Sequence, residues 1–271
     1  MIRLLSIGVP LLAAAATLFL LTVPDLWGTD RFFNEVRLLQ LSRCAAEGWL
    51  WPSWSPDLAH GHGFPLFHFY PAGLYLAALP FLALGLAPRV ALVIVIALAM
   101  AAGTAVLQRA IRRRTTPATG ALGGILWLTA PYLQVDLQVR HAWAEAFALA
   151  LLPVALVGFL DLAEGRRTRG AWVAAIGGMG AVVLSHNIVA LMGAGAAGLL
   201  GLLALTRRDP RALGALISSL GLTAFAWLPA LLDTSLVRLD GMSAGSFSPA
   251  NHVVMPAQLV GVAFGRGPSV P

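Results

Sequence analysis

The stretch VALVIVIALAMAAGTAVL, residues 90–107, carries no charge and is followed directly by the arginine cluster at residues 109–114. A helix rises about 1.5 Å per residue, so about 20 residues cross the roughly 30 Å hydrocarbon layer of a bilayer. A strand of a membrane barrel would alternate apolar and polar residues, whereas this run is apolar on every side. The stretch therefore predicts a membrane-spanning helix.

The composition of the whole chain agrees with that class. Of the 271 residues, 58% are hydrophobic and 11% are charged, and the mean hydropathy is +0.80, which is far from the balance of a soluble domain. The net charge of +6 would indicate nucleic acid in a soluble protein, but here every basic residue is an arginine and most lie in short clusters between apolar runs. We therefore predict an all-α, polytopic membrane protein that binds no nucleic acid.

About seven spans are expected from the apolar runs. They are placed at residues 4–23, 90–107, 118–133, 142–162, 171–205 as two short passes, and 213–232. The first run is either an uncleaved span, which we favour, or a long signal peptide. The turn between the two short passes is expected near Ser185, His186 and Asn187.

The arginines predict the orientation of these spans in a cell (inner) membrane. Short arginine-rich loops stay cytoplasmic, and the clusters at 109–114, 166–169 and 207–211 share that side only if residues 67–87 dip into the membrane and return. We therefore expect a re-entrant or interfacial helix there. Nearly all acidic and histidine residues would then lie on the extracytoplasmic face, together with residues 25–70 as the first outer loop.

That first outer loop is polar and aromatic, as loops that carry function often are. From Asp30 to Glu47, apolar residues at mixed three- and four-residue spacing predict an amphipathic helix on the membrane surface, ended by Gly48; they are Phe33, Val36, Leu39, Leu41 and Cys44. Either Asp30 at its start is a functional carboxylate, or Asp30 or Thr29 before it is merely a helix cap, worth about 1 kcal/mol. No metal site is predicted, because His60, His62 and His68 do not have the spacing of a helical ligand pair.

A second polar cluster lies between two apolar runs, at Asp136, Arg140, His141 and Glu145. Glu145 lies several residues into an apolar run, where an unpaired carboxylate would cost several kcal/mol, so we expect Arg140 or His141 to pair with it. The pair is either structural or catalytic. His186 also lies between apolar runs and is either a buried, hydrogen-bonded histidine or part of a site.

At many of these positions the sequence resembles one known family, the membrane domain named 6-pyruvoyl-tetrahydropterin synthase-related. This name implies no pterin chemistry. The first outer loop carries the resemblance at Asp30, Arg37, Gly48, Pro52, Trp54, Gly61, Gly63, Pro65, Phe67, Tyr70 and Pro71. It continues at Pro131, Tyr132, Asp136, Arg140, Glu145, Ser185, His186, Asn187, Trp227, Leu228 and Pro229.

Such proteins resemble the C-type glycosyltransferases, which transfer a sugar from a polyprenyl-phosphate donor to an acceptor at the outer membrane face. The resemblance implies that Asp30 is the catalytic base and Asp136 a second acidic position. A histidine is expected where Asn34 stands, which leaves that position without an assigned role.

An arginine suits the departing phosphate through paired hydrogen bonds. Arg140 is the first candidate and Arg37 the second; the other predicted substrate-binding residues are His141, Glu145, His186 and Tyr70. No cofactor is predicted with certainty, although Asp136 or Glu145 would suit a divalent metal. Membrane lipid and an acceptor of undefined class are the other expected partners.

A different class remains open, namely a non-catalytic membrane protein of cell-envelope assembly, either a lipid-binding subunit or a transporter. A transporter should carry ionisable residues near mid-membrane and show repeated halves, and this sequence shows neither clearly. Residues 249–271 are rich in glycine and proline and contain only a short apolar run. We therefore expect residues 1–271 to form a single transmembrane domain that is the N-terminal part of a longer protein.

Overall fold

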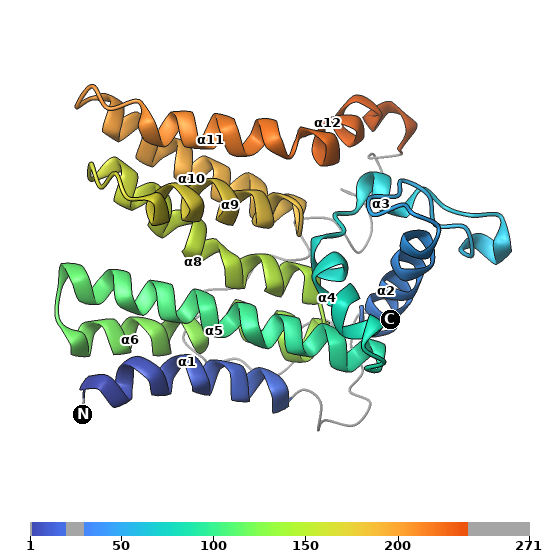
Figure 1. Ribbon diagram of the computed structural model, residues 1–271, viewed down its shortest axis with the longest axis horizontal. Helices are drawn as coiled ribbons and strands as arrows, with labels where there is room; N and C mark the ends of the chain where they lie inside the picture. Colours follow the sequence, from blue (N-terminus) through green and yellow to red (C-terminus); the bar gives the residue numbers. More distant parts are fainter. Residues whose placement is uncertain (1, 20–29, 238–271) are drawn as a thin grey trace, which may run out of the picture. The chain divides into compact units, whose positions relative to one another are not determined.

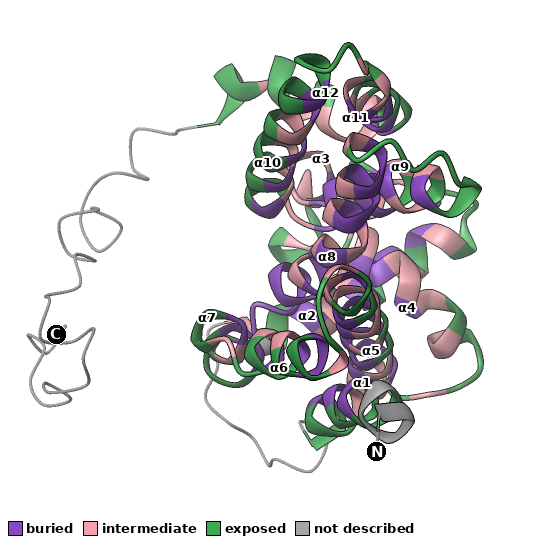
Figure 2. Cartoon of the chain, turned by 90° about the vertical axis from the view of Figure 1, so that its left-hand side faces the viewer, coloured by how far each residue is buried: buried purple, intermediate pink, exposed green. Residues whose placement is uncertain are grey.

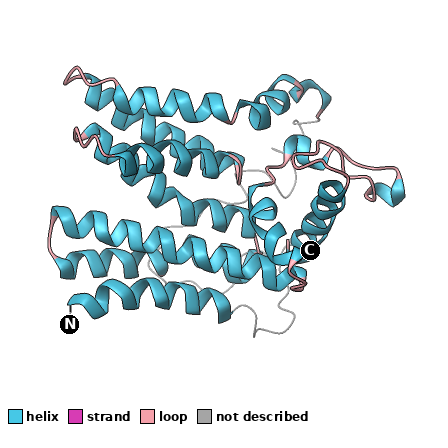
Figure 3. Ribbon diagram, viewed as in Figure 1, coloured by secondary structure: helices cyan, strands magenta, loops and turns pink. Residues whose placement is uncertain are grey.

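The computed structural model describes residues 2–19 and 30–237, without the side chains of residues 2–6 and Arg31. In the described part of the chain the regular elements are all helices, joined by loops (Figure 3), with one isolated β-bridge between Ser55 and Phe64 and no strand. It divides into two units, residues 1–230 and 231–271. In the second unit the end of α12 and the short helix η4 (Thr234–Leu236) are described. The predicted helical class is confirmed, whereas the expectations for residues 25–29 and 249–271 lie outside the described residues.

The helices begin and end close to the predicted apolar runs. They are α1 (Ile2–Leu18), α2 (Arg31–Ala46), α3 (Leu66–Phe69), α4 (Gly73–Ala83), α5 (Pro88–Arg114), α6 (Pro117–Leu128), α7 (Pro131–Val135), η3 (Asp136–Arg140), α8 (Trp143–Ala163), α9 (Arg169–Val183), α10 (Asn187–Leu205), α11 (Arg211–Leu222) and α12 (Ala224–Leu232). By length and composition α5, α8 and α10 can cross a membrane, and α11 with α12, bent by 71°, makes a fourth candidate. The seven-span arrangement stays a prediction, because the other apolar helices are shorter.

Helix α8 lies at the centre of the first unit and packs against α5, α9 and α10 (Figure 1). Two glycines permit the closest of these contacts. A Cβ on Gly103 of α5 would overlap the carbonyl oxygen of Ala150, and one on Gly158 would overlap the backbone of Ala175 in α9. Small residues of this kind let membrane helices approach closely. The buried residues accordingly follow the faces along which these helices meet (Figure 2).

The two ends of this bundle differ in charge. The loops after α5, α8 and α10, which carry the arginine clusters, lie at one end, on the left in Figure 1, while α2, α3, α4 and the α9–α10 turn lie at the other. The expectation that nearly all acidic residues lie away from the arginines was wrong for Asp161, Glu164 and Asp209. Each of these three pairs with arginines at the arginine-rich end.

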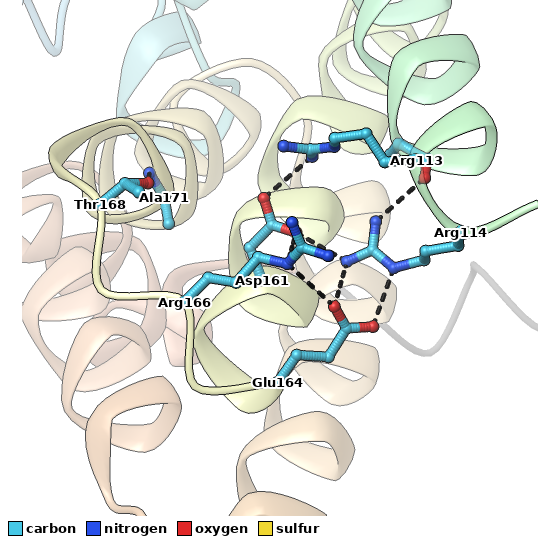
Figure 4. Close-up of polar contacts among 8 residues, drawn as sticks. Arg113, Arg114, Asp161, Glu164, Arg166, Thr168 and Ala171 are labelled. Carbon is cyan, nitrogen blue, oxygen red and sulfur yellow. Dashed lines mark hydrogen bonds and ion pairs between the residues drawn. The ribbon is translucent and has the colours of Figure 1, made fainter.

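An ion-pair network closes that end (Figure 4). The nearly buried Asp161 accepts hydrogen bonds from Arg113 at 3.0 Å and Arg114 at 2.6 Å, and Arg114 also pairs with Glu164 at 2.7 Å. The network holds the last turn of α8 against the last turn of α5. Its arginines also supply the positive charges that stabilise the Asp161 carboxylate, which is shielded from water.

Helix α2 is present as predicted, and Gly48, with φ of +92°, follows its end. The position of α2 on the membrane surface stays a prediction. Leu41 and Cys44 are buried within the protein, whereas Phe33 and Leu39 are 54% and 49% exposed. The buried face also includes Asn34, because α2 packs polar groups against the start of α4.

The chain between α2 and α5 holds two short helices, α3 and α4, and α4 is followed by a turn at Gly85 with φ of +87°. The first turn of α4 is tied to the α9–α10 turn, since the N–H of Gly73 donates to the carbonyl of Leu184 at 2.6 Å. The break predicted near Ser185 to Asn187 is confirmed by the end of α9 and the start of α10. The length of α4 agrees with a helix that does not cross the bilayer, and its re-entrant path stays a prediction.

Candidate functional site

Polar side chains from both predicted clusters meet at the end of the bundle opposite the arginine-rich loops. The backbone N–H of Asp30 donates to the carbonyl of Arg140 at 3.1 Å, which joins the start of α2 to the segment before α8. The first outer loop and the second polar cluster, which the sequence predicted separately, therefore form one site.

Arg140 lies between two carboxylates. Its Nη1 is 2.6 Å from Oδ1 of Asp136 and 3.3 Å from Oε2 of Glu145, and the Tyr132 hydroxyl donates to Oε1 of Glu145 at 2.5 Å. The predicted pairing of Glu145 with Arg140 is confirmed. The Arg140 side chain is 44% exposed, whereas both carboxylates are buried. The carboxylates therefore bind Arg140 from the interior of the protein.

Asp136 is fully buried, and its Oδ2 has no hydrogen-bond partner within the described part of the chain. Burial and the negative charge of Glu145 raise the pKa of this carboxyl to about 6, although Arg140 acts in the opposite direction. At neutral pH the group is thus close to its titration range. Because Asp136 is buried and pairs with Arg140, we infer that it positions Arg140.

The segment that carries these groups has unusual backbone geometry. Asp136 to Arg140 form one π-helical turn, and His141 follows in the left-handed region with φ of +53°. The Trp143 indole donates to the carbonyl of Leu137 at 3.2 Å and supports the turn. Such turns and strained residues concentrate at functional sites. The His141 side chain itself is buried beside Trp143, so its backbone is the part that contacts the first outer loop.

Asn34 makes that contact. Its Nδ2 donates to the carbonyl oxygens of Asp30 at 2.9 Å and His141 at 2.8 Å, and its Oδ1 accepts from the Tyr75 hydroxyl at 3.1 Å. These partners fix which side of the amide is nitrogen. The resemblance left this position without a role. The structure shows that Asn34 is fully buried and links α2 to α4 and to His141, two residues before α8.

Arg37 lies one turn further along α2. Its Nη1 donates to the hydroxyls of Tyr70 at 3.2 Å and Tyr75 at 3.4 Å, and its guanidinium lies over the Tyr70 ring, 4.1 Å from the centroid. Its hydrogen-bond partners in the described part of the chain are therefore neutral hydroxyls. The chain has three tyrosines, and all of them, Tyr70, Tyr75 and Tyr132, lie in this site. Sequence reasoning gave Tyr75 no role, although this scarcity of tyrosine was an available signal.

Asp30 lies between these two groups of residues. It occupies the position before α2, but its side chain makes no capping hydrogen bond, so the structure does not bear out the helix-cap interpretation. The Asp30 charge acts through space on Arg37, Tyr70, Asp136 and His186. The partly exposed carboxylate is therefore close to both arginine-centred groups.

His186 comes from the α9–α10 turn. Its Nδ1 accepts the N–H of Val189 at 3.5 Å, which caps α10, and its Nε2 is 4.0 Å from Oε2 of Glu145. Burial lowers the pKa of His186, so that it is mainly neutral at pH 7. It is thus a hydrogen-bonded histidine and also borders the site.

The three histidines of the first outer loop are not part of this site. His60 and His62 are exposed, and the ring of His68 contacts Phe69. The described residues contain no group of three His, Cys, Asp or Glu side chains placed to hold a metal. A small pocket does adjoin Tyr70, with Phe67, Phe69 and Trp227 among its lining residues.

Fold and site together define a multi-pass helical membrane protein with a charged and tyrosine-containing cluster at one end of its bundle. Residues 67–259 match the family described as 6-pyruvoyl-tetrahydropterin synthase related domain, membrane protein, and the chain belongs to this family. The match includes Tyr70, Asp136 and Arg140 but begins after Asp30 and Arg37. No curated protein and no solved structure matches this chain.

Proposed function

We propose that this protein is a membrane glycosyltransferase that transfers a sugar, with inversion, from a polyprenyl-phosphate donor to an acceptor. The observation that supports the proposal is that a backbone hydrogen bond joins Asp30 to Arg140, at the same end of the bundle as Arg37. Because the arginine-rich loops lie at the opposite end and such loops stay cytoplasmic, the site faces the extracytoplasmic side of the inner membrane.

Asp30 is the general base in this mechanism. Its carboxylate takes the proton of the acceptor hydroxyl while that oxygen attacks the anomeric carbon of the donor sugar. The bond between the anomeric carbon and the phosphate oxygen breaks, and the polyprenyl phosphate leaves with the electron pair. A well-placed base of this kind contributes about 10²- to 10⁴-fold to the rate.

The other residues of the site bind and position. Asp136 and Glu145 hold Arg140 at the surface of the cluster, and Tyr132 holds Glu145. His186 borders Glu145 as a neutral group. The negative charge on the departing phosphate requires a cation close to Asp30, which either Arg140 or Arg37 supplies.

The alternative is a non-catalytic lipid-binding protein. One observation favours it: Arg140 already pairs with two carboxylates, as the members of a purely structural network do. In that case Asp30 would serve to hold the two loops together through its backbone, and its carboxylate would have no task.

The test is transfer of labelled sugar from a panel of polyprenyl-phosphate donors, in membranes that contain the wild type or Asp30→Asn at equal protein level. We expect the variant to lose about 100-fold or more. The matched control is Glu47→Gln, which changes an exposed carboxylate at the other end of α2 and should leave transfer unchanged. Equal transfer by Asp30→Asn removes Asp30 from the mechanism, and transfer by none of the proteins supports the lipid-binding alternative.

A further inference from the structure

Arg37 is a partly buried arginine that forms no ion pair with any carboxylate in the described part of the chain. Its hydrogen-bond partners are the hydroxyls of Tyr70 and Tyr75. Asp30 acts on it through space without coming within ion-pair distance. A charge taken partly out of water normally gains a partner of opposite charge, and residues 30–237 supply none for Arg37.

The guanidinium has one edge left for such a partner. Of its five N–H groups, those on Nη1 face the two tyrosine hydroxyls, while the Nε and Nη2 groups make no hydrogen bond to the described residues. Two parallel N–H donors on one edge match the oxygens of a phosphate or carboxylate. Arg140 differs in that its guanidinium already pairs with two carboxylates, those of Asp136 and Glu145, at Nη1.

The neighbours hold Arg37 in a fixed orientation. The Tyr75 hydroxyl donates its proton to Oδ1 of Asn34, so its oxygen is an acceptor toward Arg37. The Tyr70 ring lies under the guanidinium, and its hydroxyl oxygen accepts from Nη1, so that its own proton can be donated to an anion. A site ordered before binding loses little freedom when the ligand arrives.

Apolar side chains lie near this guanidinium. Phe33 is exposed, and its ring centroid is 5.7 Å from the Arg37 guanidinium carbon. The small pocket next to Tyr70 has Phe67, Phe69 and Trp227 among its lining residues. A ligand with a phosphate head and a hydrocarbon chain suits these surroundings better than a free phosphate ion does.

We propose that Arg37 and Tyr70 bind the phosphate group of a polyprenyl lipid. The inference rests on the proposed function and assigns the donor phosphate to Arg37, leaving Arg140 to position other groups. Asp30, which acts on Arg37 through space, then lies close to the bond that breaks.

The test measures binding by the purified protein in phosphatidylcholine nanodiscs, with farnesyl phosphate as the probe and with farnesol and inorganic phosphate as comparisons. We expect Arg37→Gln to weaken binding of farnesyl phosphate by about 10- to 100-fold and Tyr70→Phe to weaken it by about 3- to 10-fold. Arg43→Gln is the matched control, because Arg43 lies on the same helix, is exposed and pairs with Asp57. It should leave the affinity unchanged.

Three results would overturn the assignment: loss of binding in Arg140→Gln but not in Arg37→Gln, equal binding of farnesol, or inorganic phosphate that competes as strongly as the lipid. The last would indicate a site for soluble phosphates. If Arg37→Gln does not fold, Arg37→Lys, which keeps the charge but loses the paired donors, and Tyr70→Phe decide the question. The probe, farnesyl phosphate, carries no sugar, so the binding test does not depend on enzyme activity. If binding depends on Arg37 but no sugar transfer is measured, only the enzyme proposal is rejected.

Discussion

Asn34 and His141 are joined by a hydrogen bond of 2.8 Å from the asparagine amide to the histidine carbonyl. The same amide nitrogen binds the carbonyl of Asp30. One buried side chain therefore fixes the start of α2 against a residue in the left-handed conformation, which needs such support to persist. The position of the Asp30 carboxylate depends on this contact.

Replacement of Asn34 by alanine should destabilise the fold. Two backbone carbonyls and the Tyr75 hydroxyl lose a partner inside the protein, so we expect a loss of about 2 kcal/mol or more in the free energy of unfolding. Asn34→Asp should be at least as damaging, because a carboxylate cannot donate to the two carbonyls. Thermal unfolding of the purified variants, with Ser42→Ala on the same helix as control, measures the effect. Unchanged unfolding temperatures would show that the contact is dispensable.

Asp136 should make stability depend on pH. Its pKa is about 6 in the folded protein and about 3.8 in the unfolded chain, so the folded state binds its proton more tightly. The stabilising contribution of the protonated group is full below about pH 4 and is lost as the pH rises through 6, by about 3 kcal/mol in total. The unfolding temperature of the wild type should therefore fall relative to Asp136→Asn between about pH 4 and pH 7. A difference that stays constant over this range would contradict the assigned pKa.

The close contact of α8 with α9 should not tolerate a methyl group. In Gly158→Ala the new Cβ would overlap the backbone of Ala175, which cannot move aside, so we expect a loss of about 1–3 kcal/mol or more. Gly177 on α9 is the matched control, because its Cβ would meet nothing within 4 Å. Gly177→Ala should be neutral or slightly stabilising. Equal unfolding temperatures for the two variants would argue against this packing.

Asp161 should matter more than Glu164 to the arginine-rich end. Asp161→Asn leaves Arg113 and Arg114 without their more buried counter-charge, and we expect it to cost about 2–3 kcal/mol. Glu164→Gln removes a more exposed partner of Arg114 and should cost less than about 1 kcal/mol. Thermal unfolding at low and high salt compares them, and an equal effect of both changes would show that burial does not set the strength of this network.

The apolar helices and the break between α9 and α10 could be predicted because they depend on local patterns. The breaks at residues 129–130 and at Thr223 were not predicted, since residues 118–133 and 213–232 were each expected to form one run. Charge-free runs mark the apolar helices, and the arginine clusters correctly placed three loops at one end of the bundle. The pairing of Arg140 with Glu145 could be predicted too, since a carboxylate inside an apolar run needs a nearby partner.

The remaining contacts depend on packing between distant segments. Tyr75 lies in an apolar stretch and contacts Arg37 and Asn34 only because α4 packs on α2. The exposure of Phe33 and Leu39 follows from the same packing, which turns a polar face of α2 inward and which the spacing of apolar residues does not encode. Asp161 was missed as a member of the arginine-rich end, since its partners come from another helix.

Helix α8 carries an arginine-bound carboxylate near each of its ends, Glu145 with Arg140 and Asp161 with Arg113 and Arg114. At about 1.5 Å per residue these two carboxylates are roughly 24 Å apart along the axis, close to the thickness of the hydrocarbon layer. Charged pairs favour the headgroup level on both sides of a bilayer. We therefore expect the two charged pairs to fix the position of α8 along the membrane normal. This position would keep the Arg140 cluster at the level of the lipid phosphates.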